Sequence, residues 1–204
     1  MKKLIVLLLS LTTSPWVAAQ SGAVANYFRD TEAFQQALNE EYADSTTSPL
    51  LPHDRENFSG LPFYPIDAQL RVTARFMRTP GSPPFAMPTS RPRRTIYEQY
   101  GKAQFTLRDT TYELLIYQSH ELRVTEKYRN HLLLPFTDLT SGTETYGGGR
   151  YLELTIPKSD TIVIDFNKAY HPYCAYNPKY ACPIPPRENN LPVAIRAGVR
   201  LGEH

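Results

Sequence analysis

The sequence lacks the motifs that mark the common enzyme and membrane-protein classes. It contains no Gly-x-Ser-x-Gly elbow, no His-Glu-x-x-His pair and no glycine fingerprint for a dinucleotide. Its longest apolar run, residues 4–11, is far shorter than the roughly 20 residues that span a bilayer. The sequence therefore points to no cofactor, and it names no reaction.

The sequence also lacks an excess of either charge. Lys and Arg number 22 against 20 Asp and Glu, and two of the lysines, Lys2 and Lys3, belong to a predicted leader. A chain of balanced charge has no overall field that would draw it onto nucleic acid. One local basic cluster remains, formed by Arg91, Arg93 and Arg94. It is typical of a solvated loop, and the alternative is a patch for an anionic ligand.

The N-terminus has the pattern of a signal peptide. Lys2 and Lys3 precede the apolar residues 4–11, and Pro15 interrupts the run before the small residues Val17, Ala18 and Ala19. We therefore expect residues 1–19 to be a signal peptide cleaved between Ala19 and Gln20. A lipid anchor would need a cysteine directly after this point, and the first cysteine is Cys174. The expected location is periplasmic or secreted, with no membrane span after cleavage.

The rest of the chain predicts one helix followed by a β domain. Residues 26–42 repeat apolar side chains every three or four positions, so we expect a helix and linker over residues 20–48. Pro52 suits the first turn of a further short helix. From residue 49 to residue 204 we expect a single β domain. Alternating apolar residues predict strands at 70–76, 96–100, 103–107, 112–116, 152–156, 162–166 and 193–195.

Short, one-sided strands separated by turns are typical of antiparallel pairing. The predicted fold is therefore mainly β, an antiparallel sandwich or a partly open barrel with one N-terminal helix.

Seven segments resemble the bacterial family called domain of unknown function 1684. They are GLPFYP (60–65), LPFTDLTSG (134–142), TYGGGRY (145–151), DFN (165–167), CAYNP (174–178), CP (182–183) and ENNLP (188–192). The resemblance covers roughly residues 44–198. It implies a mostly β protein without an established activity, and it carries over no catalytic residue.

Two cysteines, Cys174 and Cys182, lie eight positions apart. In an exported chain an even cysteine count favours a disulfide between them. The alternative is a zinc or copper site formed by both cysteines and His171. A strong zinc signature has ligands in closely spaced pairs, and these are missing here. We therefore expect no metal. Relatives without export signals resemble this chain in these cysteines, which an oxidative role alone does not explain. A catalytic thiol lacks an evident partner carboxylate.

Other special residues gather between residues 144 and 180. Gly147, Gly148 and Gly149 lead into a predicted strand, which favours a turn over a phosphate cradle, although Arg150 suits an anionic group.

Glu144, Asp165 and His171 are the candidates for acid–base catalysis. Asp165 and Asn167 equally suit hydrogen bonds that hold the following loop to the sheet. Prolines prevent a helix through Tyr170, Tyr173, Tyr176 and Tyr180, whose rings suit a sugar or peptide groove or a cover over the barrel end.

We carry three hypotheses forward. The first is a monomeric binding module of the cell envelope for a small ligand, a glycan or a peptide, with Tyr146, Arg150, Asp165, Asn167 and Tyr176 in one pocket. The second is a hydrolase that uses Asp165 or Glu144 with His171. The third is a structural envelope or assembly factor, which an apolar surface patch without a cleft would favour.

Overall fold

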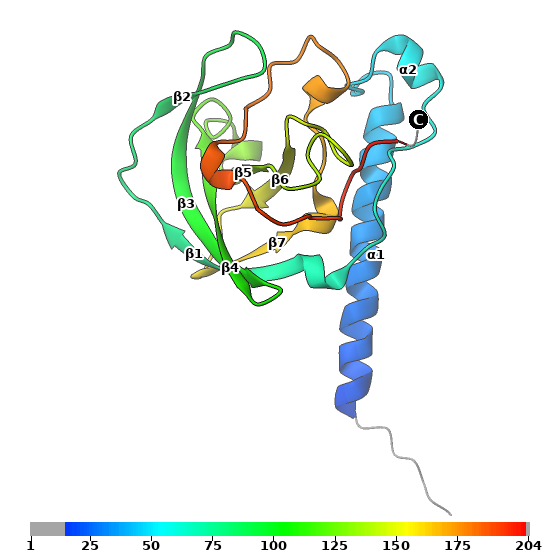
Figure 1. The fold of residues 1–204 in the computed structure, drawn as a ribbon, viewed down its shortest axis with the longest axis vertical. Helices are drawn as coiled ribbons and strands as arrows, with labels where there is room; N and C mark the ends of the chain where they lie inside the picture. The colour runs from blue at the N-terminus through cyan, green and yellow to red at the C-terminus, as the bar shows by residue number, and fades with distance from the viewer. Residues whose placement is uncertain (1–14, 203–204) are drawn as a thin grey trace, which may run out of the picture.

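The computed structural model describes residues 15–202, with side chains from residue 25. Two helices, α1 (Pro15–Ala43) and α2 (Pro52–Glu56), precede the strands (Figure 1). The strands are β1 (Arg71–Arg78), β2 (Phe85–Met87), β3 (Thr95–Leu107), β4 (Thr110–Ser119), β5 (His131–Phe136), β6 (Arg150–Thr155) and β7 (Thr161–Asp165). Short 3-10 turns lie at Ala68–Leu70, Glu126–Tyr128, Phe166–Lys168, Tyr173–Ala175 and Arg187–Asn189.

All the strands belong to one antiparallel sheet that curls into a half-barrel. Its order is β6-β5-β4-β3-β1-β7, and β2 pairs with β3 beside this path. Arg108 and Asp109 turn the β3–β4 hairpin with φ values of 48° and 63°, as a two-residue turn of matching twist requires. The expected mainly β fold with one N-terminal helix is confirmed, and the partly open barrel, not the two-sheet sandwich, is the form it takes.

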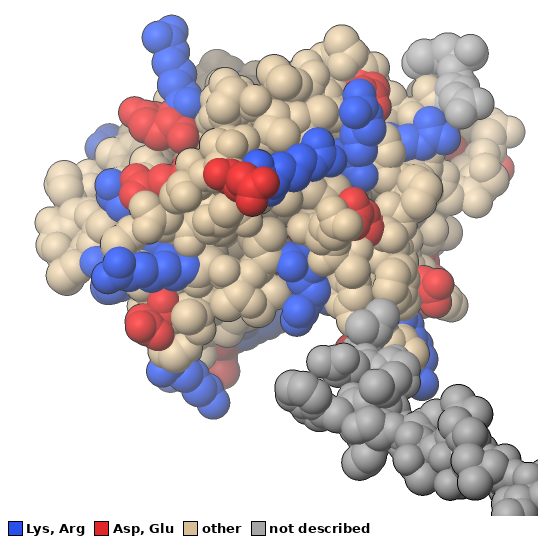
Figure 2. Space-filling view, turned by 60° about the horizontal axis from the view of Figure 1, so that its bottom comes forward, with Lys and Arg blue, Asp and Glu red and all other residues tan. Residues whose placement is uncertain are grey.

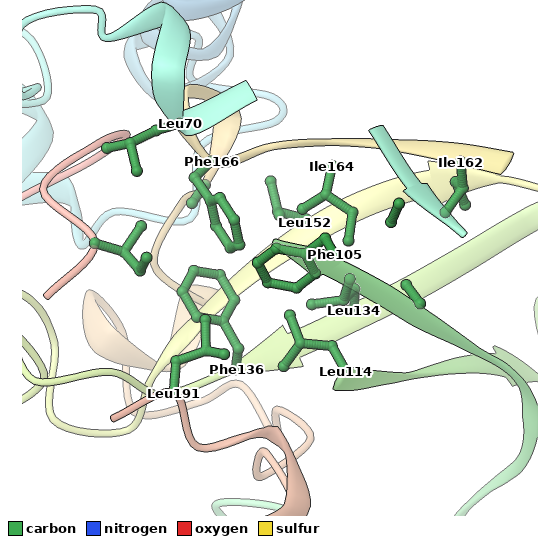
Figure 3. Packing of buried hydrophobic residues seen from close by; sticks show 14 of the residues in the cluster. Leu70, Phe105, Leu114, Leu134, Phe136, Leu152, Ile162, Ile164, Phe166 and Leu191 are labelled. Carbon is green, nitrogen blue, oxygen red and sulfur yellow. The ribbon is translucent and has the colours of Figure 1, made fainter. Parts of the chain in front are cut away.

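The main core fills the concave side of the half-barrel. Alternate residues of the strands point inward, which buries one face of each strand. Figure 3 shows Phe105, Phe136 and Phe166 converging there, and the Phe136 and Phe166 rings meet edge to face at 5.3 Å. Leu114, Leu134, Leu152 and Ile164 pack around them. A second cluster lies on the outer face of β4, β5 and β6, where the segment that carries Cys182 covers Tyr117, Leu133 and Tyr151.

Helix α1 lies beside the half-barrel, and its N-terminal part extends past the sheet (Figure 1). The helix predicted over residues 26–42 is present but begins at Pro15. Its packed stripe runs through Thr31, Phe34, Leu38 and Tyr42, whereas Ala37, which the periodicity placed on this face, is exposed. Pro52 opens α2 as expected.

The strand predictions differ from the structure at four places. The sequence predicts no strand at β2, which has only three residues. Residues 193–195 form no strand, because Ile195 is held as a buried loop residue whose carbonyl bonds to Arg150. The predicted strands 96–100 and 103–107 are one strand, β3, with an irregularity between Gln99 and Gly101. Strand β5 was missed because Leu132, Leu133 and Leu134 are all buried and show no alternation.

Surface charge is mixed. Figure 2 shows Lys and Arg interspersed with Asp and Glu over the visible face, as the balanced composition implies. Within the described residues, no helix combines the length and the hydropathy needed to cross a membrane. Of the predicted signal peptide, residues 1–14 lie outside the described part of the chain. The predicted cleavage point between Ala19 and Gln20 falls within α1.

Candidate functional site

Arg150 is, with Asn167, one of the two most deeply buried of the predicted ligand-binding residues. It opens β6, is 1% exposed, and its guanidinium donates to Asp138 Oδ2 at 2.5 Å and to the Ile195 carbonyl at 2.7 Å. It also donates to the Ala197 carbonyl. Burial lowers the pKa of this guanidinium, against the charge of Asp138. Arg150 therefore fastens the C-terminal segment to the sheet, and its donors face the interior.

Asp165 and Asn167 join the helix to the end of the sheet. Asp165 Oδ1 accepts from the Asn167 backbone at 3.1 Å, from the Asn167 amide at 3.0 Å and from the Tyr27 hydroxyl of α1 at 3.2 Å. The Asn167 amide also donates to the Asp67 carbonyl and accepts from the Asp67 backbone, at 2.8 and 2.9 Å. The pair anchors backbone as the sequence suggested, but the anchored segments are α1 and the residues before β1, not the loop that follows β7.

The three acid–base candidates do not meet. Glu144 accepts a fork of hydrogen bonds from Arg196, at 2.7 to 3.1 Å, and one from the Tyr64 hydroxyl at 3.1 Å. The Arg196 bonds hold the pKa of Glu144 below its usual value. Because Asp165 faces Asn167 and Tyr27, neither carboxylate orients His171.

His171 is 2% exposed. Its Nε2 accepts from the Tyr146 backbone at 3.2 Å, and Nδ1 lies 3.4 Å from the Tyr176 hydroxyl. Burial, followed by the nearby charge of Arg150, lowers the pKa of His171 to about 3. The ring is therefore neutral at ordinary pH, and its observed contacts are structural.

Cys174 and Cys182 lie side by side as thiols. The Cys174 backbone N–H points at Cys182 Sγ over 3.2 Å. Burial raises the pKa of the Cys182 thiol to about 12. Burial and the neighbouring Cys174 also raise the pKa of the Tyr146 hydroxyl. In the part of the chain that the structure describes, no three His, Cys, Asp or Glu side chains are arranged to hold a metal ion.

The glycine run forms a turn before β6. Gly149 has φ +88°, and a Cβ there would meet the Phe136 carbonyl at 2.5 Å, so only glycine fits. The residues that follow form a strand and not a helix, so the turn lacks the helix N-terminus that a phosphate cradle uses.

An open cleft lies elsewhere, between α1 and the outer face of β5 and β6. We call it the tyrosine cleft. Its volume is about 360 Å³. It is lined by Phe34, Leu38, Glu41, Leu122, Tyr128, His131, Glu153, Tyr170 and Tyr173. The size falls within the range of roughly 300 to 1,000 Å³ that is usual for small-molecule sites.

The strand register places the polar wall of the tyrosine cleft. Glu153 pairs with Leu133, and His131 pairs with Thr155, so Glu153 and His131 are diagonal neighbours on the outer face. His131 Nε2 pairs with one oxygen of Glu153, and the Tyr170 hydroxyl donates to the other. Across the cleft, the Tyr173 hydroxyl donates to Glu41 of α1. Each carboxylate thus holds a tyrosine hydroxyl.

These contacts keep Glu153 ionised. Burial acts to raise its pKa, but the His131 and Tyr170 contacts outweigh burial, and the pKa lies below the usual 4.5. Burial and the charge of Glu153 raise the pKa of Tyr170, and burial with the Glu41 bond raises that of Tyr173. The Glu153 side chain remains 49% exposed, although each of its carboxylate oxygens already has one hydrogen-bond partner.

The tyrosine set predicted to line a groove divides between sites. Tyr170 and Tyr173 line the tyrosine cleft, whereas Tyr176 packs edge to face on the buried Tyr42 at 5.2 Å. The sequence does not identify His131 as a site residue, because this histidine opens β5, which alternation does not predict. The sequence places Glu153 on the outer face of a strand, but nothing in it links that residue to His131 or to Glu41.

The chain was compared with known proteins. None of the curated proteins matches it. A solution NMR structure of an uncharacterised protein from Haloarcula marismortui superposes with a TM-score of 0.69 at 30% identity, over 88% of this chain and 97% of that one. The model of the family described as protein of unknown function DUF1684 matches residues 56–200. The chain therefore belongs to the DUF1684 family.

Proposed function

We propose that the protein is a binding module whose tyrosine cleft holds a short neutral glycan. The observation that carries the proposal is the pair of carboxylates, Glu153 and Glu41, each fixed by a tyrosine hydroxyl in a cleft with aromatic walls. Among the cavities of the described residues, this cleft is the one in which two carboxylates each accept from a tyrosine hydroxyl.

The chemistry of the walls favours a sugar. Ionised carboxylates accept strong hydrogen bonds, and sugar hydroxyls supply donors in number. Phe34, Tyr128 and Tyr170 line the cleft, and aromatic rings of this kind can pack against the C–H face of a pyranose while tyrosine hydroxyls meet its polar groups. Because the acceptors carry negative charge, an acidic sugar would be repelled. A neutral glycan meets all three conditions.

Hydrolysis by Asp165 or Glu144 with His171 receives no support, because these groups bond to other partners. Of the carboxylate–imidazole pairs among the described residues, Glu153 with His131 is the one that lines the tyrosine cleft. If this pair hydrolysed a bound glycan, incubating the protein with that glycan would release a shorter sugar.

The test begins with a neutral and acidic glycan array, followed by calorimetry on each positive glycan. Glu153→Gln keeps the shape but removes the charge, and we expect at least about tenfold weaker binding, equal to roughly 1.4 kcal/mol. Glu113→Gln, on β4, where the 40% exposed side chain pairs with Lys102, is the matched control and should bind normally. Binding that is indifferent to Glu153→Gln, or a preference for acidic glycans, would refute the site.

We also propose that the protein is exported and that its signal peptide is cleaved. The basic start, the apolar residues 4–11 and the small residues before Gln20 support a cleaved signal, and an oxidising compartment would join Cys174 to Cys182. Intact mass spectrometry of the native protein, without reductant, tests both ideas. We expect an N-terminus at Gln20 and a mass two hydrogens below that of the dithiol. An uncleaved chain with free thiols would contradict this.

A further inference from the structure

A groove opens between the two end strands of the half-barrel. Strands β6 and β7 follow one another in the chain, yet no ladder joins them. The space between them is about 480 Å³ and is lined by residues 152–158 and 161–163, with Arg71, Asp165 and Lys168. The half-barrel therefore ends in two neighbouring strand edges.

The backbone of β6 presents unused hydrogen-bonding groups to this groove. The Tyr151 N–H and C=O bond to Tyr170, at 2.9 and 3.1 Å, and so face away from β5. Because direction alternates along an antiparallel strand, the N–H and C=O groups of Glu153 and Thr155 face the same way. Pro135 lies opposite Tyr151 and has no N–H to donate, which agrees with this alternation.

Strand β7 presents its edge from the other side. Phe76 of β1 donates to the Asp160 carbonyl at 2.7 Å, so the even-numbered residues of β7 bond to β1. The backbone groups of Val163 therefore point into the groove. Its side chain is 40% exposed on the outer face.

The chain itself shows that the free edge of β6 can pair. Tyr170 forms an antiparallel bridge with Tyr151, and the residues before it, on the Glu153 side, form the 3-10 turn Phe166–Lys168 and no strand. An extended segment that continued this line would meet Glu153 and Thr155 next. Exposed strand edges of this kind are templates for strand addition.

Charge indicates the chemistry of the segment. Three cations, Arg71, Lys158 and Lys168, line the groove. The two carboxylates there are engaged, Glu153 with His131 and Tyr170, and Asp165 with Asn167 and Tyr27. Arg71 and Lys168 rest on the rings of Tyr27 and Phe34, at 5.2 and 5.5 Å, and neither forms an ion pair with another described residue, although Arg71 lies opposite Asp165 in the strand register. An acidic segment would complement this rim.

We propose that the β6 edge binds an extended acidic segment of another polypeptide as an added strand. Main-chain hydrogen bonds to Glu153 and Thr155 supply affinity, and Arg71, Lys158 and Lys168 select negative side chains. This interaction uses backbone groups of the edge, whereas glycan binding uses side chains of the tyrosine cleft, and Glu153 lines both sites.

The probe is a fluorescein-labelled decapeptide of alternating Val and Glu, measured by fluorescence anisotropy against the same peptide with Lys in place of Glu. Thr155→Pro removes one outward N–H, and a proline is tolerated at a strand edge. Lys158→Glu reverses an exposed charge without touching the backbone. Arg94→Glu, in the loop before β3, is the matched charge control. Circular dichroism reports that each variant is folded.

We expect the acidic peptide to bind and the basic one not to. Lys158→Glu should weaken binding at least about fivefold, and Arg94→Glu less than twofold. Thr155→Pro and N-methylation of alternate peptide residues should each abolish the anisotropy change. Equal binding of both peptides, or binding unaffected by N-methylation and Lys158→Glu, would overturn the proposal. The proposal would also be overturned if light scattering gave the mass of a dimer and Thr155→Pro lowered it to that of a monomer, because the edge would then bind a second copy of the chain.

Discussion

The imidazole of His131 and the carboxylate of Glu153 pair across two adjacent strands on the outer face of the sheet. The two residues are diagonal neighbours, offset by two positions along the strands, because His131 lies opposite Thr155 and Glu153 lies opposite Leu133. This diagonal contact fixes the carboxylate at the wall of the tyrosine cleft, and the glycan proposal depends on it.

Glycan binding should depend on pH through Glu153. Its pKa lies below 4.5, so the carboxylate is charged through the neutral range and becomes protonated only in acid. Affinity should be level from neutral pH to 4.5 and fall below it. Calorimetry across this range measures the effect. A loss of affinity already complete above pH 5.5 would point to a different group.

Stability should fall in acid because of His171. The pKa of this ring is about 3 in the folded chain, against 6.5 for an unperturbed histidine side chain. Between these values the unfolded chain binds the proton and the folded chain does not, so stability is fully present above pH 6.5 and is lost as pH falls toward 3.

This difference in the pKa of His171 between the folded and unfolded chain is worth up to about 5 kcal/mol of folding stability at neutral pH. His171→Asn retains an acceptor for the Tyr146 N–H and removes the titration. Urea unfolding at several pH values should show a flatter profile for this variant. An unchanged slope between pH 6.5 and 4 would exclude His171 as the cause.

Breaking the Arg150–Asp138 pair should strongly destabilise the fold. Both side chains are fully buried, so Arg150→Met leaves an uncompensated carboxylate, and we expect a loss of about 3 to 5 kcal/mol. Asp138→Asn should also destabilise, and the double variant should lose less than the sum of the two. Chemical denaturation of the four proteins gives this cycle, and strict additivity would contradict a direct pairing.

Asn189 should matter more than its neighbour Asn190. Its side chain accepts from the Leu115 backbone at 2.7 Å and donates to the carbonyls of Leu115 and Pro135, at 2.9 and 2.7 Å. Asn189→Ala leaves these β4 and β5 groups unpaired at a cost of about 3 kcal/mol. Asn190→Ala loses only an exposed bond to Thr137 and is the control, with a change below about 0.5 kcal/mol. Equal effects would contradict the bridging role.

If the cysteines are joined, removing the bond should lower stability. In the chain-entropy treatment a loop this short contributes roughly 2 to 3 kcal/mol. The Cys174→Ala, Cys182→Ala double variant should show that loss relative to the oxidised protein, and the oxidised protein should show it on adding reductant. Thermal unfolding with and without reductant provides the measurement. A reductant-independent midpoint would indicate that the thiols are not joined.

Much of the fold could be predicted because alternation is a local signal. Leu114, Ile116, Ile162 and Ile164 point inward as their spacing requires. β5 could not be recognised in this way, since its leucines are buried on both faces by the core and by the cysteine segment.

The site was much less predictable. In the sequence Arg150 looks like a ligand-binding residue, yet in the structure it forms a buried ion pair with Asp138. The tyrosine cleft joins Glu41, His131, Glu153 and Tyr170, residues from four distant segments. Only the curl of the sheet and the position of α1 bring them together, and no local pattern encodes that.

The most direct test of the glycan proposal uses the histidines as reporters. The protein labelled with ¹³C at histidine Cε1 is titrated with the tightest neutral glycan and followed by NMR. We predict that the His131 signal moves and saturates with the affinity measured by calorimetry, while His53 and His120, which lie outside the tyrosine cleft, stay fixed. A saturable shift at His120 or His53 with His131 unmoved would contradict the account.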